Sequence, residues 1–355
     1  MNSHIATFIK KLPQNSFFVL HGNTEVLRNG DVFFPFRQSS YFLYLTGLNI
    51  PSIILTIFWD EIIIWRDPIS EKEKIWWHSK WNDTKISEIS GITDIRDIIG
   101  FQEYKNKNEH HFIEEAIYLP IIHRLRLLKT PDEIQKIQKV IKITNYIFSY
   151  IQEYAKPGMY EYEIDAMVAY QFRIHQGIEA FPSIVASGPN GCILHYTHNN
   201  RQINQGDLVL LDFGIEIDGY GADISRTFSI SGGFTTRQQE IYDAVLDVRE
   251  FAKNILRPWI PRKEWNIQTK IYMWDICRKI HLPNIEKYSS LENPYFPHSI
   301  GHFLWLDTHD VGDSEAMLQS GMVMTIEPGI YIPEEAIGIR IEDDYLVTES
   351  GCEML

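Results

Sequence analysis

The chain has 355 residues, 44% of them hydrophobic, which is enough for two globular domains. Its formal net charge of −14 argues against a nucleic-acid partner, because phosphate contacts require clustered lysines and arginines. The most apolar stretch, Ile53 to Trp65, is interrupted by Asp60 and Glu61, so we expect no membrane-spanning segment. The N-terminal segment lacks the cleavage site of a signal peptide, and the three cysteines are too scattered for a disulfide framework. We therefore expect a cytoplasmic protein.

Short runs rich in branched and aromatic residues predict strands in the first part of the chain. The runs are Phe17–Leu20, Phe42–Leu45, Ile53–Trp59 and Ile62–Trp65. A tight turn at Asp60 would join the last two runs into a hairpin. Three tryptophans farther along predict an aromatic cluster that packs in a core or against another domain: Trp76, Trp77 and Trp81.

The pattern changes to helical near residue 123. Thr130 is suited to an N-cap and Pro131 to the first turn, and the two acids that follow face the positive end of the helix dipole. Apolar residues recur as far as Tyr146, and the helix is predicted to end at Pro157-Gly158. A second helix is predicted over 162–175. We place the domain boundary near residue 123, which gives domains of residues 1–122 and 123–355.

Two acidic residues are predicted on neighbouring apolar strands. The turn pair Asp218-Gly219 favours a two-residue hairpin loop. In that register Asp212 lies opposite Ser225, and Asp223 lies on the same face, diagonal to Asp212. Diagonal Cβ atoms are about 7–8 Å apart. Both carboxylates can therefore bracket one pair of ions.

A second predicted hairpin brings two more acids together. Its turn is centred between Glu334 and Glu335, so Glu327 lies opposite Glu342, and Arg340 shares the face of Glu342. Like charges that face each other destabilise a sheet, and a buried charge without a partner costs several kcal/mol. One arginine cannot compensate four carboxylates, whereas two divalent cations can.

Histidines are the nitrogen-bearing candidates for the same site. His298 and His302 are spaced like two ligands on one helical turn, but a preceding proline and Gly301 argue against a helix there. No glutamate follows the first histidine, so a helical zinc motif is not expected. His309 is a third candidate. His195 is the fourth, in a segment predicted to run from a loop into a strand.

These motifs, in this order, resemble those of the pita-bread metallopeptidases, and the proline-specific branch of aminopeptidase P and prolidase is the most similar. The matching segments after residue 123 are GCILHYT, LDFG with ADISRTF, HSIGH with LDTHDVG, TIEPGIY and GIRIEDD. In the first domain, PFRQSSYFLYLTGL is similar to the N-terminal domain of aminopeptidase P. The sequence departs from the family pattern at Trp305, where glycine is usual, and at Tyr41, where an acid is common.

The resemblance implies an α+β fold: a C-terminal pita-bread domain, with two related halves around a curved antiparallel sheet, and a smaller α/β N-terminal domain. It implies five metal ligands, namely Asp212, Asp223, His302, Glu327 and Glu342. It also implies that Arg340 lies beside these acids and that three histidines line the substrate site: His195, His298 and His309. We expect a homo-oligomer, with a dimer favoured.

The expected reaction is hydrolysis of the bond between an N-terminal residue and a proline at position two of a peptide substrate. A hydroxide bridging two metal ions would attack the carbonyl, and Glu327 would pass a proton to the leaving proline nitrogen. His309 and His195 would hydrogen-bond the developing oxyanion and the substrate carbonyls, and His298 would contact the chain beyond the proline. The oxygen-rich ligand set favours Mn²⁺, with Co²⁺ or Zn²⁺ as alternatives.

Prolidase, which is limited to Xaa-Pro dipeptides, is the nearest alternative, because the first domain is short and Trp305 could close the exit groove. We favour the aminopeptidase, since Arg340 is better explained as neutralising Glu342 than as a site for a substrate carboxylate. The alternative from a different class is a non-enzymatic peptide- or protein-binding module on this fold. Such a module would have lost the metal ligands, whereas all five are present in this sequence.

Overall fold

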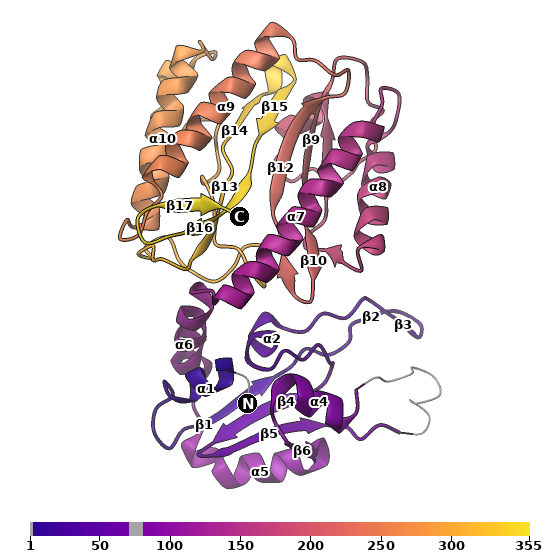
Figure 1. The fold of residues 1–355 in the computed structure, drawn as a ribbon, viewed down its shortest axis with the longest axis vertical. Coiled ribbons are helices and arrows are strands. Elements are labelled where there is room, and N and C mark those ends of the chain that lie inside the picture. The colour runs from indigo at the N-terminus through magenta and orange to yellow at the C-terminus, as the bar shows by residue number, and fades with distance from the viewer. Residues whose placement is uncertain (1–2, 71–80) are drawn as a thin grey trace. The chain divides into compact units, whose positions relative to one another are not determined.

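The structure, a computed structural model, describes residues 3–70 and 81–355 (Figure 1). Its contacts divide the chain into two compact domains, Met1–Arg126 and Leu127–Leu355. The boundary predicted near residue 123 falls inside helix α6 (Glu115–Leu127), just before this division. Among the described residues, no helix is both long enough and apolar enough to cross a membrane. Of the three tryptophans predicted to cluster, Trp76 and Trp77 lie outside the described residues.

The N-terminal domain is built on a four-stranded sheet of order β1-β4-β5-β6 (Figure 1). Three of its strands are antiparallel neighbours and match predicted runs: β1 (Phe17–His21), β4 (Ile54–Phe58) and β5 (Glu61–Arg66). β6 (Asp94–Asp97) runs parallel to β5. The predicted hairpin is confirmed, since Phe58 pairs with Glu61 across the turn. The domain also contains α1 (Ser3–Ile9), β2 (Leu27–Asn29), β3 (Val32–Phe33), α4 (Asp83–Ser90) and α5 (Phe101–Asn108).

The strand predicted at Phe42–Leu45 is wrong, because Ser40–Thr46 form helix α2. The Ser39 side chain accepts a hydrogen bond from the backbone N–H of Phe42 as an N-cap, and Gly47 ends the helix at a φ of 71°. A short continuous apolar run fits a buried helix as well as a buried strand. The capping residues Ser39 and Gly47 favour the helix over the strand.

Two helices open the C-terminal domain, and both were predicted from the sequence. α7 (Pro131–Tyr154) begins with a capping box formed by Thr130 and Glu133, and α8 (Glu161–Ile174) follows it. They pack on a three-stranded antiparallel sheet of order β12-β9-β8 (Figure 1). Its strands are β8 (Ile184–Ser187), β9 (Leu208–Phe213) and β12 (Ile224–Ser229). Short strands β7 (Ile178–Glu179), β10 (Ile215–Ile217) and β11 (Tyr220–Gly221) form a second small sheet.

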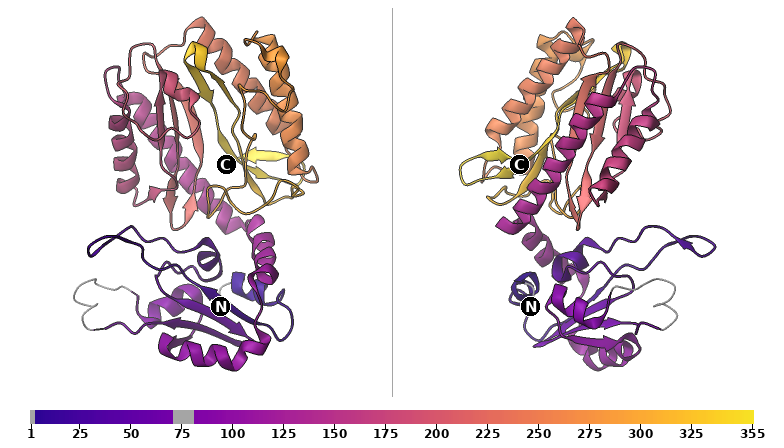
Figure 2. Two further views of the ribbon diagram at one scale, coloured as in Figure 1. Left: turned by 180° about the vertical axis from the view of Figure 1, so that it is seen from behind. Right: turned by 45° about the vertical axis from the view of Figure 1, so that its right-hand side comes forward.

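The second half of this domain repeats the arrangement of two helices on strands. α9 (Thr236–Ile255) and α10 (Arg262–Lys279) lie side by side, and α9 runs along the strands (Figures 1 and 2). One sheet has the order β13-β16-β17, with strands Val323–Ile326, Asp343–Val347 and Cys352–Met354. β14 (Gly329–Ile332) and β15 (Ile337–Arg340) form a hairpin. A core that includes Trp265, Phe296 and Tyr345 fills the space between helices and strands.

The two halves meet along β15, which lies beside β9 and β12. The Arg340 N–H donates to the Thr227 hydroxyl, which donates to the Arg340 carbonyl. Farther along, the Glu342 N–H donates to the Ser225 carbonyl at 3.0 Å. The acid-bearing hairpins of the two halves are therefore direct neighbours, and the predicted α+β architecture is confirmed.

Candidate metal centre

The first acid-bearing hairpin has the register that its turn predicted. Ser225 pairs with Asp212, and both turn residues, Asp218 and Gly219, have positive φ as this hairpin turn requires. Gly214 allows the chain to bend there, because a Cβ at this position would lie 1.7 Å from the Ala222 carbonyl oxygen. Asp223 follows directly and is buried, as is Asp212.

The second hairpin also keeps its predicted register. Gly329 pairs with Arg340, and the same register two residues farther out aligns Glu327 with Glu342. The ladder is interrupted at this point and resumes beyond it in the same register, where Ile326 of β13 pairs with Asp343 of β16. Just before the interruption, the Ile341 N–H donates to the Pro328 carbonyl at 3.2 Å. Both glutamates thus lie at this interruption, between the β14-β15 and β13-β16 pairs.

His302 stands among these carboxylates in irregular backbone, as the sequence predicted. Asp223, His302 and Glu342 each offer a ligand atom, and these atoms lie within 4.8 Å of one another. His302 Nε2 is 3.3 Å from Asp223 Oδ2 and 3.7 Å from Glu327 Oε1. His302 Nδ1 is 3.0 Å from the Phe303 carbonyl oxygen. A proton on Nδ1 leaves Nε2 with a lone pair that faces two carboxylates, an arrangement that suits a cation between them.

Buried oxygens without hydrogen-bond partners also indicate a cation site in this cluster. Among the described residues, Asp212 Oδ1 and Glu342 Oε1 are buried and have no hydrogen-bond partner. Burial raises the pKa of Asp223, and repulsion from Asp212 raises it further. Burial likewise raises the pKa of Glu342, and repulsion from Asp223 adds to it. Burial also raises the pKa of Glu327. Oxygens of this kind are costly to bury unless a cation or a proton binds them, so the donor set fits hard divalent metal ions.

Arg340 is the basic residue within the cluster, and its ion pair differs from the prediction. Its Nη2 donates to Asp212 Oδ2 at 2.6 Å, because β15 lies beside β9. Its Nε donates to the Ser225 hydroxyl, which in turn donates to Glu342 Oε2 at 2.7 Å. The sequence predicted that Arg340 neutralises Glu342. The structure pairs it directly with Asp212 and connects it to Glu342 through Ser225, and its charge also lowers the pKa of Glu342.

His298 lies next to the cluster with both ring nitrogens engaged. Its Nδ1 is 2.8 Å from the Ser299 carbonyl oxygen, and its Nε2 is 2.8 Å from the hydroxyl of Tyr331. Arg340 Nη1 donates to that hydroxyl at 3.0 Å, so the Tyr331 proton points toward His298. Burial lowers the pKa of His298 well below its usual range. The neutral ring therefore has only carbon atoms left to contact a substrate.

The other two predicted histidines lie close to His298 and His302. The His309 ring packs edge-on against the His302 ring, with centroids 4.2 Å apart. Partial burial lowers the pKa of His309, and nearby His302 and His195 lower it further. The predicted strand at His195 is wrong, since this residue lies in a turn followed by irregular backbone. The structure nonetheless brings His195 near both His298 and His309, whose pKa values it affects.

Two further residues of this region were not predicted. Asp344 is almost fully buried, and its Oδ2 accepts a hydrogen bond from the backbone N–H of Asp223 at 3.2 Å. Arg262, at the start of α10, donates to the Gly301 carbonyl, and its positive charge lowers the pKa of Glu327. The run of three acids ending at Asp344 is a visible signal in the sequence. Arg262 has no signal of that kind, because only the tertiary fold brings it close.

Trp305, the residue that departs from the family pattern, is buried beneath this region. Only 1% of its surface is exposed. Its ring lies beside that of Tyr220, and Lys129 Nζ is 5.2 Å from the ring centroid. Lys129 forms a fully buried ion pair with Asp310 at 3.5 Å, next to His309 in the chain. Trp305 therefore supports the segment that carries His309 rather than lining a cavity.

We expect Trp305→Ala to lower the free energy of unfolding by about 3–5 kcal/mol, the usual cost of removing a buried large aromatic ring. Metal content and KM for peptides should change little. Urea unfolding measures the loss. Trp259→Ala, at a tryptophan that is 74% exposed, is the matched control and should stay within about 0.5 kcal/mol of the unsubstituted protein. Unchanged stability together with an altered KM would show that Trp305 faces the substrate.

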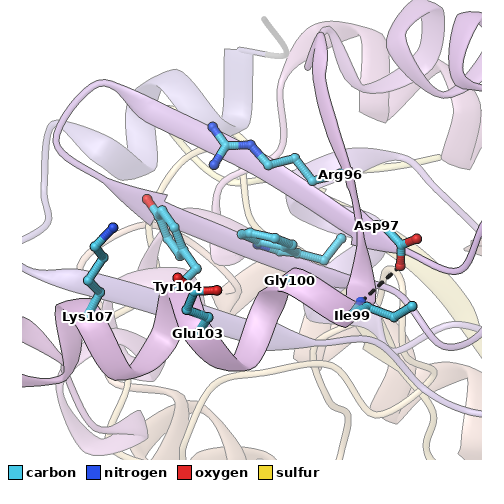
Figure 3. A pocket seen from close by; sticks show the side chains of 8 residues that line it. Arg96, Asp97, Ile99, Gly100, Glu103, Tyr104 and Lys107 are labelled. Atoms are coloured by element: carbon cyan, nitrogen blue, oxygen red, sulfur yellow. Dashed lines mark hydrogen bonds between the residues drawn. The ribbon is translucent and has the colours of Figure 1, made fainter.

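A separate cavity of about 440 Å³ lies in the N-terminal domain. Its lining includes Trp65 and Tyr104 together with charged side chains such as Arg96 (Figure 3). The Arg96 guanidinium forms a two-point hydrogen bond with Asp94 and lies 5.6 Å from the Trp65 ring centroid. Its charge is thus compensated within the domain. None of the residues predicted for the metal site lines this cavity.

Comparisons with known proteins cover nearly the whole chain. A family model described as metallopeptidase family M24 matches residues 135–349, and one described as the aminopeptidase P N-terminal domain matches residues 2–112. A Haemophilus influenzae protein named Xaa-Pro aminopeptidase is 33% identical, over 97% of this chain and 91% of its own. The structure of Zn-substituted aminopeptidase P of E. coli in complex with product has a TM-score of 0.90 at 29% identity, covering 99% of this chain and 93% of that one. Proline aminopeptidase P II of Yersinia pestis has a TM-score of 0.89 at 28% identity, with 99% and 94% covered.

Proposed function

Because the chain belongs to metallopeptidase family M24, we propose that it is an Xaa-Pro aminopeptidase, which removes the first residue of peptides that have proline at position two. The observation that carries the proposal is the group of Asp223, His302 and Glu342, whose ligand atoms lie within 4.8 Å of one another. The substrate class is supported by similarity to a named Xaa-Pro aminopeptidase over almost the full length of both chains.

We infer that this enzyme holds two divalent metal ions, preferably Mn²⁺, through five side chains: Asp212, Asp223, His302, Glu327 and Glu342. Bound there, the ions would activate a water molecule and polarise the substrate carbonyl. The protein orients three of the ligands through hydrogen bonds to the side-chain atom that does not face the metal site. Arg340 holds one oxygen of Asp212, Ser225 holds one oxygen of Glu342, and the Phe303 carbonyl fixes the His302 ring. In each case the remaining donor atom is left free for a metal.

Glu327 and the histidines around the cluster would transfer the proton, stabilise the oxyanion and contact the substrate. The raised pKa of Glu327 suits a carboxyl that takes a proton and gives it to the leaving proline nitrogen. Its Oε2, on the side of His298, is the atom that we assign to carry this proton. His309 and His195 would donate hydrogen bonds to the developing oxyanion and the substrate carbonyls. His298, with both nitrogens occupied, would contact the chain beyond the proline through its ring carbons.

The cysteines and the net charge bear on the location and the partners of the enzyme. We propose a cytoplasmic enzyme that forms a homodimer and acts on peptides. All three cysteines, Cys192, Cys277 and Cys352, are free thiols, which agrees with a reducing compartment. The net charge of −14 suits a protein that does not bind nucleic acid.

The substrate length decides between aminopeptidase and prolidase. A dipeptidase must bind the free carboxylate that directly follows proline, which requires a positive group. Arg340 is fully engaged by Asp212, Ser225 and Tyr331. Arg262 is the other arginine whose charge lowers the pKa of Glu327, and its contact with Gly301 uses a single Nη2 hydrogen bond. Arg262 is thus the residue to test if dipeptides are preferred.

We expect the protein, reconstituted with Mn²⁺, to cut Ala-Pro-Ala at the Ala-Pro bond with a kcat/KM at least comparable to that for Ala-Pro. Release of free alanine measures both reactions, and Ala-Ala-Ala serves as the control without proline. Hydrolysis of Ala-Pro alone would show a prolidase, and Arg262→Ala should then abolish that preference. No hydrolysis of any peptide by protein that has bound its metal would refute the proposed activity.

A further inference from the structure

Glu161, the first residue of α8, forms a buried hydrogen-bond centre away from the metal ligands. Its side chain is fully buried and accepts five hydrogen bonds. Oε1 accepts from the N–H and the hydroxyl of Ser187, both at 2.7 Å, and from Asn190 Nδ2 at 3.0 Å. Oε2 accepts from the Tyr196 hydroxyl at 2.7 Å and from the Arg201 N–H at 3.0 Å. None of these donors belongs to the predicted metal-ligand set.

The donors bracket His195 on both sides along the chain. Ser187 and Asn190 precede it, at the end of β8 and in the short 3₁₀ helix η3 (Gly188–Cys192), whereas Tyr196 directly follows it. The backbone from 193 to 200 belongs to no helix or strand. Regular backbone pairing therefore does not fix this segment, and the side chain of Glu161 supplies its main polar anchor.

The opposite side of the segment rests on β15. A Cβ added to Gly338 would lie 2.0 Å from the Gly191 carbonyl oxygen, so the two backbones are in direct contact. The Cys192 thiol donates to the Ile337 carbonyl at 3.3 Å. The Tyr196 ring packs in a small core with Leu210 and Tyr331. Glu161 on one side and β15 on the other thus hold the segment in place.

We propose that Glu161 is a positioning residue that holds the 188–200 segment so that His195 faces the metal centre. The catalytic consequence rests on the proposed function, while the structural role does not. A carboxylate can accept hydrogen bonds at about four lone-pair sites on its two oxygens. Glutamine at this position would turn an amide NH₂ toward two or three of the donors. At least one end of the segment would then lose its anchor.

Glu161→Gln should lower kcat/KM for Xaa-Pro peptides by up to about a hundredfold, the scale expected when a reacting group is misplaced by 1 Å. Metal content should stay unchanged. The matched control is Glu163→Gln, two residues farther along the same helix. Glu163 Oε2 accepts the Tyr160 N–H at 2.7 Å, and among the described residues no hydrogen bond joins Glu163 to the 188–200 segment. We expect the control to retain activity within about threefold of the unsubstituted enzyme, because it loses only a helix-capping interaction.

A double substitution separates positioning from general damage. If Glu161 acts through His195, Glu161→Gln should cause no additional loss in protein that already carries His195→Ala. Losses that multiply would overturn the proposal, because they would place the effect elsewhere. If Glu161→Gln does not fold, Tyr196→Phe can replace it, since it removes one of the five donors. It should lower kcat/KM less, and this loss should also be absent in protein that carries His195→Ala.

Hydrogen exchange supplies a readout that needs no activity. Amides of residues 188–200 should exchange faster in Glu161→Gln than in Glu163→Gln, while those of β9 and β12 stay protected. Equal exchange rates in the two variants would overturn the positioning role. If the unsubstituted enzyme proves inactive with its metal bound, the proposed function fails, but the exchange result still tests the anchor.

Discussion

Glu342→Gln is expected to remove at least one metal ion per chain and to lower kcat/KM by more than about a hundredfold, since loss of an outer partner alone costs 10–100-fold. The side chain is 2% exposed, with one oxygen held by Ser225 and the other without a partner among the described residues. Glutamine keeps the size and can keep the bond to Ser225, but it removes the negative charge. The metal-free variant should be at least as stable as the metal-free parent, because the repulsion between Glu342 and Asp223 disappears.

A loss of metal and activity without a loss of stability in the metal-free state distinguishes a lost ligand from a misfolded protein. Elemental analysis measures the metal content, and urea unfolding in the presence of a chelator measures the stability. Glu334→Gln is the matched control, because Glu334 is an exposed acid in the turn of the same hairpin. It should leave metal content and activity unchanged. Full metal occupancy in Glu342→Gln would contradict its assignment as a ligand.

The sequence predicted the parts of the site that depend on local geometry. The Asp218-Gly219 turn set the register of Asp212 with Ser225, and the turn at residues 333–336 set that of Glu327 with Glu342. A turn of known length determines every pair along its hairpin, so acids many residues apart could be placed on one face. The capped start of α7 was predictable for the same reason, since its signals lie within four residues.

The sequence did not predict the features that tertiary contacts determine. The partner of Arg340 is Asp212 because strands from two different halves lie side by side, and no spacing within one hairpin contains that information. The five hydrogen bonds to Glu161 come from residues 26 to 40 positions away, so no local sequence pattern marks this glutamate. The incorrect strand prediction at α2 has a local cause. Ser39 and Gly47 are typical helix-end residues, but the apolar run between them also fits a strand.

Removal of the metal ions is expected to make the stability of the protein depend strongly on pH. Burial raises the pKa values of Asp223, Glu342 and Glu327, and repulsion from neighbouring carboxylates adds to the first two, from Asp212 on Asp223 and from Asp223 on Glu342. A carboxyl with a raised folded-state pKa retains its proton in the folded chain after the unfolded chain has lost it. Its contribution to stability is therefore complete below the unfolded pKa of about 4 and is lost as the pH rises through the folded pKa.

Bound divalent ions replace those protons, so the metal-loaded protein should escape this loss. The quantity to measure is the difference in unfolding free energy between Mn²⁺-loaded and chelator-treated protein, at several pH values from about 5 to 8. Groups common to both forms, such as the buried neutral His298, cancel in this difference. It should increase with pH, and Glu342→Gln should reduce the increase, because one of the coupled carboxylates is gone. A difference that does not change with pH would mean that these acids do not bind the metal, since binding to protonated carboxyls must release protons.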